Sequence, residues 1–129
     1  LYPADIRERA AVDEFLDRFH TGIRGAFFRH EAAALGYSRE KGGMGAVPPD
    51  PAAAAEAEAA MQPTLALLDG LVSPDAVVLG RFTIADCALA PVLHRTTRTG
   101  LDLSAYPRIS ALRERLITRP SFLAAGPVG

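Results

Sequence analysis

The sequence predicts an all-α fold, a helical bundle of four to five main helices in which residues 1–129 form a single domain. Apolar residues recur at spacings of three and four along most of the chain, as on one face of a helix. No segment alternates apolar and polar residues as a half-buried strand would. The composition, with 49% hydrophobic and 22% charged residues, is typical of a folded globular domain.

The first helix is predicted over about residues 5 to 32. Asp5 is a suitable N-cap, and Glu8 three residues later completes a capping box. Successive residues placed 100° apart gather an apolar arc that runs from Val12 to His30, opposite an arc of charged and polar residues. The segment is therefore predicted to form one long amphipathic helix.

Residues 36 to 51, GYSREKGGMGAVPPDP, contain four glycines and three prolines, and we expect them to form a mobile connection. The GGMG run lacks the preceding strand that a phosphate-binding loop requires. A second helix is predicted to begin at Asp50-Pro51, an N-cap followed by proline at the first helical position. Its apolar stripe continues to Val72 across Pro63, so we expect a kink there.

The remaining helices are indicated by their terminal residues. The short run VVLG, residues 77 to 80, is expected to be a buried connection, and a third helix follows from Thr83. A fourth helix is predicted after Tyr106-Pro107, and Arg119-Pro120 should end it, with one further turn after that. Apart from the long connection over residues 36 to 51, the sequence thus predicts helices joined by short segments.

The stretch RFTIADCALAPVL, residues 81 to 93, contains chemically reactive residue types but does not predict a catalytic site. Cys87 and His94 are seven residues apart, which separates them by about 10 Å along a helix. No cysteine and histidine spacing matches a metal site. With Thr83 as N-cap, Asp86 falls at the third helical position, and the two residues form a predicted capping box. We therefore predict no catalytic residue and no metal site.

Charge and composition exclude other classes of function. Fourteen basic residues balance fifteen acidic ones, so we expect no nucleic acid or anionic membrane as a partner. No apolar run approaches the roughly 20 residues of a membrane span, and no signal-sequence pattern is visible. The single cysteine excludes an internal disulfide and suits a reducing compartment. We expect a cytoplasmic protein.

The run GRFTIAD followed by ALAP, residues 80 to 91, resembles the capped central helix in the C-terminal domain of glutathione transferases. YPRI at residues 106 to 109 and RPSF at 119 to 122 resemble the family's next helix and its end. The opening LYP, which lacks a methionine, resembles the end of the family's inter-domain linker. Arg81 stands where the family often has an acidic residue or lysine, and the loop 36 to 51 leaves the transferase class open.

The resemblance implies separate roles for two domains of a longer parent protein. Glutathione, the co-substrate, would be bound mainly by an N-terminal thioredoxin-like domain, which is absent from these residues. The helical half would bind a hydrophobic small-molecule electrophile in a detoxifying reaction and help to form a homodimer. We therefore expect the parent protein to be an enzyme and the isolated chain to be inactive.

Four residues of the first helix are the candidate electrophile-binding residues. Arg24 and His20 lie one turn apart on the polar arc, with Phe27 and Phe28 beside it. An aromatic wall with one or two polar groups suits a cleft for an apolar substrate. The alternative for these residues is a solvated arginine and two core phenylalanines.

Two other functions remain open at this stage. Similar helical domains serve as non-catalytic interaction or assembly modules in other proteins. A plain four-helix bundle with its own ligand is disfavoured, because FTIAD and RPSF occur together at the family's spacing.

Overall fold

The computed structural model describes residues 1–36 and 46–126, and every regular element in those ranges is helical. This confirms the all-α prediction. Val72, which directly follows the helix Gln62–Leu71 (α5), forms an isolated bridge with Val78. Of the connection predicted to be buried, Val77 and Val78 are buried, whereas Leu79 and Gly80 are exposed. No helix in the described ranges has both the length and the hydropathy to cross a membrane. In chain order the elements are α1 (Ile6–Arg18), η1 (Phe19–Ile23), α2 (Arg24–Leu35), α4 (Pro51–Ala60), α5 (Gln62–Leu71), α6 (Ile84–Thr99), α7 (Pro107–Ile117) and α8 (Pro120–Ala124).

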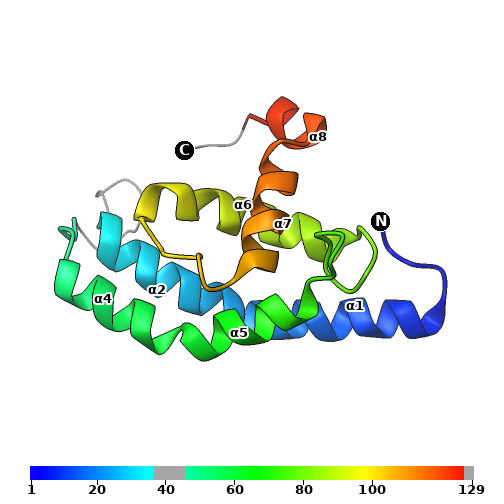
Figure 1. Cartoon of the computed structure of the whole chain (residues 1–129), viewed down its shortest axis with the longest axis horizontal. Helices are drawn as coiled ribbons and strands as arrows, with labels where there is room; N and C mark the ends of the chain where they lie inside the picture. Colours follow the sequence, from blue (N-terminus) through cyan, green and yellow to red (C-terminus); the bar gives the residue numbers. More distant parts are fainter. Residues whose placement is uncertain (37–45, 127–129) are drawn as a thin grey trace.

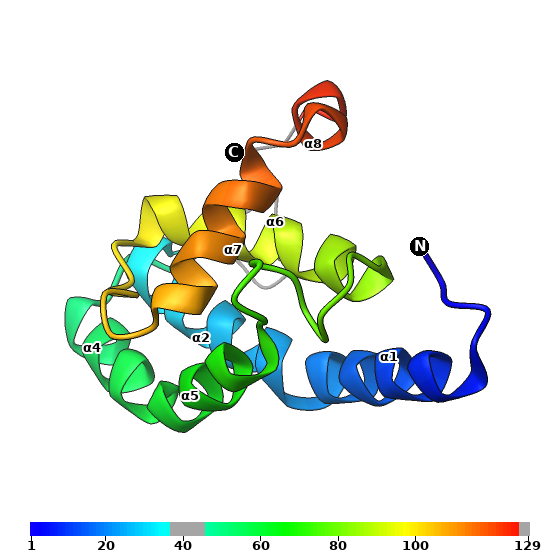
Figure 2. The same ribbon diagram turned by 45° about the vertical axis from the view of Figure 1, so that its right-hand side comes forward.

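The helices form a bundle around α6. Figure 1 shows α1 and α2 as one long helical run, with α4 and α5 returning alongside it in the opposite direction. The central helix α6 lies against α2, and Figure 2 shows α7 crossing in front of α6 and leading into α8. The core between these elements contains Leu89 and Leu93 of α6 and Leu112 of α7, all with no exposed surface.

The first helix is longer than predicted and is not uniformly α-helical. A π-helical turn, η1, separates α1 from α2, and the Arg24 amide donates to the Phe19 carbonyl five residues earlier. Buried residues recur at a strict spacing of four at Phe15, Phe19, Ile23 and Phe27. On an α-helix each such step drifts by about 40° around the axis. The wider π turn offsets this drift and keeps the four side chains on the core side.

The second helix begins and bends where the sequence predicts. Asp50 caps α4 by accepting from the Ala53 amide at 3.1 Å, and Pro51 occupies the first helical position. The helical run is interrupted at Met61, two residues before Pro63, and resumes as α5. Met61 is 1% exposed, so the bend itself packs against the core.

The predicted mobile loop 36–51 falls largely on residues 37–45, which lie outside the described residues. The residues beside it are held together, because the Asp50 amide donates to the Ala33 carbonyl at 2.8 Å. Gly36 has φ = 67°, a left-handed conformation that favours glycine.

The N-terminus of α6 has the predicted capping box and further contacts. Asp86 Oδ2 accepts from the Thr83 amide at 2.9 Å, and Thr83 Oγ1 accepts from the Ala85 amide at 3.1 Å. Asp86 Oδ1 accepts from the Val78 amide at 2.9 Å, so the same carboxylate holds the buried connection. The Ile84 amide donates to the Leu1 carbonyl at 3.1 Å. The amides at this buried helix end are thus paired.

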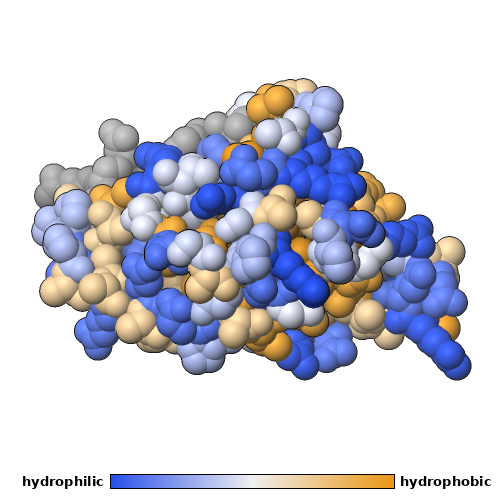
Figure 3. All heavy atoms as spheres, viewed as in Figure 1, coloured by the Kyte–Doolittle hydropathy of each residue, from blue (hydrophilic) through white to orange (hydrophobic). Residues whose placement is uncertain are grey.

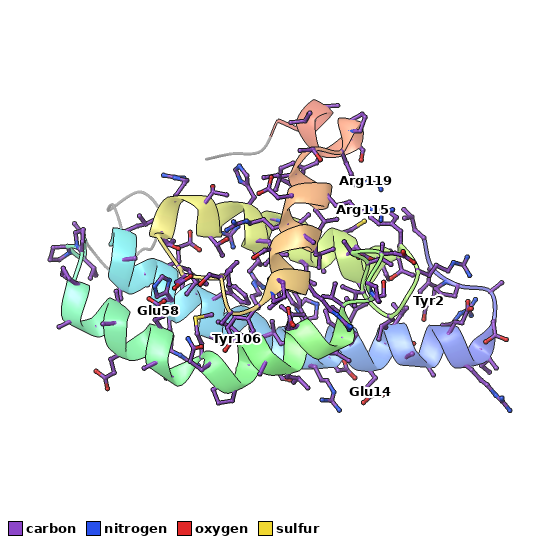
Figure 4. All side chains as sticks on the ribbon, viewed as in Figure 1. Tyr2, Glu14, Glu58, Tyr106, Arg115 and Arg119 are labelled. Carbon is purple, nitrogen blue, oxygen red and sulfur yellow. The ribbon has the colours of Figure 1, made fainter. Side chains whose placement is uncertain are left out.

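The capping box predicted at the first helix forms only in part. Asp5 Oδ1 accepts from the amides of Arg7 and Glu8, as an N-cap should. The Glu8 carboxylate, however, binds the Arg81 guanidinium at 2.8 Å. Glu8 therefore joins α1 to the segment before α6, because a charged partner distant in sequence lies within its reach. Figure 4 shows Tyr2 close to the same end of α1, where its hydroxyl donates to Asp13 at 2.8 Å.

Candidate functional site

A cavity of about 530 Å³ opens between α6, the end of α7 and α8. Its apolar wall includes Phe82, Ala90 and Pro91 on one side and Leu116 and Phe122 on the other. Ligand pockets in proteins typically have volumes of roughly 300–1,000 Å³ and mostly apolar walls. The cavity therefore has the size and surface of a small-molecule site.

Arg119, at the junction of α7 and α8, forms the polar part of this wall. Its guanidinium carbon lies 3.8 Å above the centre of the Phe82 ring, a cation–π contact. The Arg119 Nε is buried and has no hydrogen-bond partner in the structure. Figure 3 shows hydrophilic side chains gathered where α7 leads into α8, the region in which Figure 4 labels Arg115 and Arg119.

A second arginine joins the cavity to the first helix. Arg95 of α6 lines the cavity, and its Nε donates to Glu31 of α2 at 2.9 Å. Both side chains are partly buried, which strengthens their attraction relative to an exposed pair. The charge of Arg95 is therefore matched within the protein, unlike that of Arg119.

Cys87 and His94 both line the cavity, yet the described structure contains no hydrogen bond between them. The His94 ring packs edge-on against Phe122, with 5.4 Å between ring centres. A cysteine nucleophile needs a base within about 3.2 Å of its sulfur. No cluster of three or more metal-ligating side chains occurs in residues 1–36 and 46–126.

Asp86 is fully buried and has a structural role. Burial raises the pKa of the Asp86 carboxyl above its ordinary range, while the bonds from the Val78 and Thr83 amides act in the opposite direction. Both of its oxygens are already occupied by backbone donors. The carboxyl therefore stabilises the helix end and is closed to a substrate.

The four predicted binding residues lie on the first helix and do not line this cavity. His20, Arg24 and Phe28 are exposed along one side, four residues apart, and His20 belongs to the π turn. The ring of His20 packs edge-on against Phe19. Phe27 is only 5% exposed and packs in the core, where it supports the helix. The binding role of these residues stays a prediction.

Comparison with protein-family models identifies residues 51–115, about half of the chain, as a glutathione S-transferase C-terminal domain. The chain belongs to this family. The family resemblance is therefore confirmed. GRFTIAD and α6 with its Thr83–Asp86 capping box lie inside the matched region, and RPSF lies beyond its end. A comparison with curated protein sequences gives no match.

Solved structures share the fold of this glutathione transferase domain at low sequence identity. Glutathione transferase F2 from Populus trichocarpa superposes with a TM-score of 0.76 at 16% identity, covering 96% of this chain and 57% of that protein. Ure2p, in a structure with bound glutathione, gives a TM-score of 0.69 at 13% identity, covering 95% and 54%. The chain thus spans little more than half the length of these proteins.

Sequence reasoning did not find the cavity between α6 and α8. Phe82 directly precedes the predicted cap Thr83, and Arg119 falls at a predicted helix end, so local sequence assigns neither residue to a binding site. The available signal was the aromatic and basic content of RPSF, residues 119 to 122. Its position against α6 depends on the crossing of α7, which local spacing does not indicate.

Proposed function

We propose that this chain is the electrophile-binding and dimerisation half of a glutathione transferase. A thioredoxin-like domain before it would bind glutathione and lower the pKa of its thiol. The helical half would hold a hydrophobic electrophile beside the thiolate. The observation that carries this proposal is the family match over residues 51–115.

The proposed reaction is attack of the glutathione sulfur on an electrophilic carbon. With an aromatic halide, a carbon–sulfur bond forms, the carbon–halogen bond breaks, the halide leaves and the thiol proton passes to solvent. The helical half contributes by orienting the electrophile at the reacting sulfur. No residue of this chain is assigned a covalent or proton-transfer role.

The exposed side of η1 and α2 supports this proposal. Arg24 offers a positive charge that can stabilise negative charge developing on the electrophile. Phe28, 51% exposed, offers an apolar surface one turn away, and His20 offers a ring with polar nitrogens. Phe27 holds these neighbours in place from the core. We place this reaction in the cytoplasm and in a homodimer.

Conjugation of glutathione to 1-chloro-2,4-dinitrobenzene tests the proposal. A longer protein with a thioredoxin-like domain before this chain should turn over, and the chain alone should not exceed the rate in buffer. Arg24→Ala in the longer protein should lower kcat and kcat/KM for the halide and leave KM for glutathione nearly unchanged, because the charge that develops on the electrophile loses its partner. Arg29→Ala, also exposed on α2, is the matched control and should change none of these constants.

The other outcomes have defined meanings. Turnover by the chain alone would contradict the assignment of thiol activation to another domain. A longer protein that folds but shows no turnover would refute the enzyme proposal and favour an assembly module. Equal effects of Arg24→Ala and Arg29→Ala on the kinetic constants would show that Arg24 is not part of the binding site.

A further inference from the structure

Arg119 carries a charge that the described protein does not match. No carboxylate pairs with it in residues 1–36 and 46–126, and its buried Nε has no hydrogen-bond partner. A buried donor without a partner is uncommon in folded proteins and calls for an explanation. The Nε itself is closed to the cavity, but Arg119 is only partly buried, and within the described part of the chain its two terminal nitrogens are neither buried nor paired. Since Arg119 lines the cavity of about 530 Å³, an occupant of that cavity can accept from these terminal N–H groups.

The stacking of Arg119 on Phe82 leaves it suited to a planar anion. The guanidinium carbon lies 3.8 Å from the ring centre. The N–H groups of a guanidinium lie in its own plane, so a ring beneath it does not occupy them. A carboxylate can accept two of these N–H groups at once, which gives short and strong bonds.

The rest of the wall limits the charge and shape of the ligand. No aspartate or glutamate lines the cavity, and Arg95 is already paired with Glu31 at 2.9 Å. One unmatched positive charge favours a ligand with a single negative charge over a doubly charged phosphate. The rings of Phe82 and Phe122, with Pro91, favour an apolar and aromatic body.

We propose that the cavity between α6 and α8 binds an aromatic carboxylate, with Arg119 as the anchor of its charged group. The aromatic body lies against Phe82, Pro91 and Phe122. This site needs no glutathione and does not include the exposed side of α2, so it is independent of the proposed function.

Titration calorimetry with two matched probes tests this site on the chain itself. The probes are 2-naphthoate and 2-naphthamide, which share a ring system and differ in charge. We expect 2-naphthoate to bind with a Kd of about 0.1–1 mM, the range that ligand-efficiency limits allow for so small a molecule. The neutral amide should bind about 10- to 100-fold more weakly, because the charged hydrogen bonds are lost.

Two variants locate the binding. Arg119→Met should bring the affinity for 2-naphthoate down to that for 2-naphthamide. Arg98→Met, an exposed arginine on α6 outside the cavity wall, is the control for general positive charge and should leave the difference between probes in place. Ala125→Trp, at an exposed position on the cavity wall, should weaken both probes by filling the space.

The proposal is overturned if neither probe binds at probe concentrations up to about ten times the upper expected Kd, or if both probes bind with equal affinity. It is also overturned if Arg119→Met and Arg98→Met have the same effect, or if Ala125→Trp leaves both affinities unchanged. Circular dichroism of each variant separates a loss of binding from a loss of folding. If Arg119→Met fails to fold, the probe difference together with Ala125→Trp decides the matter.

Discussion

Replacing Asp86 by alanine removes both acceptors that hold the start of α6. The amides of Val78 and Thr83, each 2.9 Å from an Asp86 oxygen, would lose their partners inside the protein. Asp86 itself has no exposed surface, so water does not replace it readily. The perturbation is therefore local, and it affects both the helix cap and the buried connection before it.

The magnitude follows from these two bonds. A buried donor left without a partner costs about 1–3 kcal/mol. Removal of a buried carboxylate offsets part of this cost, because its ionised form is poorly solvated there. We expect Asp86→Ala to lower the free energy of unfolding by about 2–4 kcal/mol. For a chain of 129 residues this corresponds to a Tm lower by roughly 8–15 °C.

Urea unfolding and thermal melting measure this change, and hydrogen exchange locates it. The Val78 and Thr83 amides should exchange faster in Asp86→Ala than in the wild type. Asp86→Asn keeps one acceptor but places its NH2 group against a backbone N–H. Its free energy of unfolding should therefore lie between those of the wild type and Asp86→Ala. Asp17→Ala, an exposed change on α1, is the control and should stay within about 0.5 kcal/mol. An unchanged Tm in Asp86→Ala with altered ligand binding would refute the structural role.

The same carboxyl predicts a dependence on pH. Because burial raises the pKa of Asp86 above the unfolded value near 3.8, the folded state binds its proton more readily. The stability difference between wild type and Asp86→Ala should therefore grow as pH falls through the folded pKa towards the unfolded one. Urea unfolding of both proteins at several pH values between about 4 and 7 measures it. A stability difference that shrinks on acidification would contradict the view that burial is the main influence on the pKa of Asp86.

Other predictions separate packing from surface roles. Thr83→Ala should cost about 1 kcal/mol in urea unfolding and Thr83→Ser much less, because serine keeps the cap oxygen; equal losses would contradict the cap. Phe27→Ala should cost about 3–5 kcal/mol, whereas Arg24→Ala should stay within about 0.5 kcal/mol by the same measurement. A double-mutant cycle on Glu8 and Arg81, both more than half exposed, should give a coupling of at most about 1 kcal/mol.

Features that depend on a few neighbouring residues could be predicted from the sequence. Asp50 with Pro51, and Thr83 with Asp86, act within one helical turn, and both caps are present as expected. The interruption beside Pro63 follows from the chemistry of one residue. These signals need no knowledge of what packs against them.

Features that depend on distant partners could not be predicted in the same way. Glu8 binds Arg81, 73 residues away, in place of its own helix end. The second oxygen of Asp86 binds Val78 because the buried connection folds back over α6. The π turn follows from the packing of Phe19 and Ile23 against the core. In each case tertiary contact selected one of several locally acceptable arrangements.

The candidate site shows the same limit. The sequence predicts that Phe27 and Phe28 both flank the polar side that carries His20 and Arg24. The structure exposes His20, Arg24 and Phe28 but buries Phe27 in the core. The sequence did not indicate that Phe82, Arg119 and Phe122 meet around a cavity, because Phe82 precedes α6 whereas the other two follow α7. Their meeting depends on how α7 crosses α6.

Calorimetric titration of the chain with glutathione and with S-(2,4-dinitrophenyl)glutathione tests the central claim most directly. If this half holds the electrophile and another domain holds glutathione, the aryl conjugate should bind weakly and glutathione alone should show no saturable binding at millimolar concentration. Binding of glutathione as tight as that of its conjugate would contradict the claim, because the thiol site would then lie within these residues.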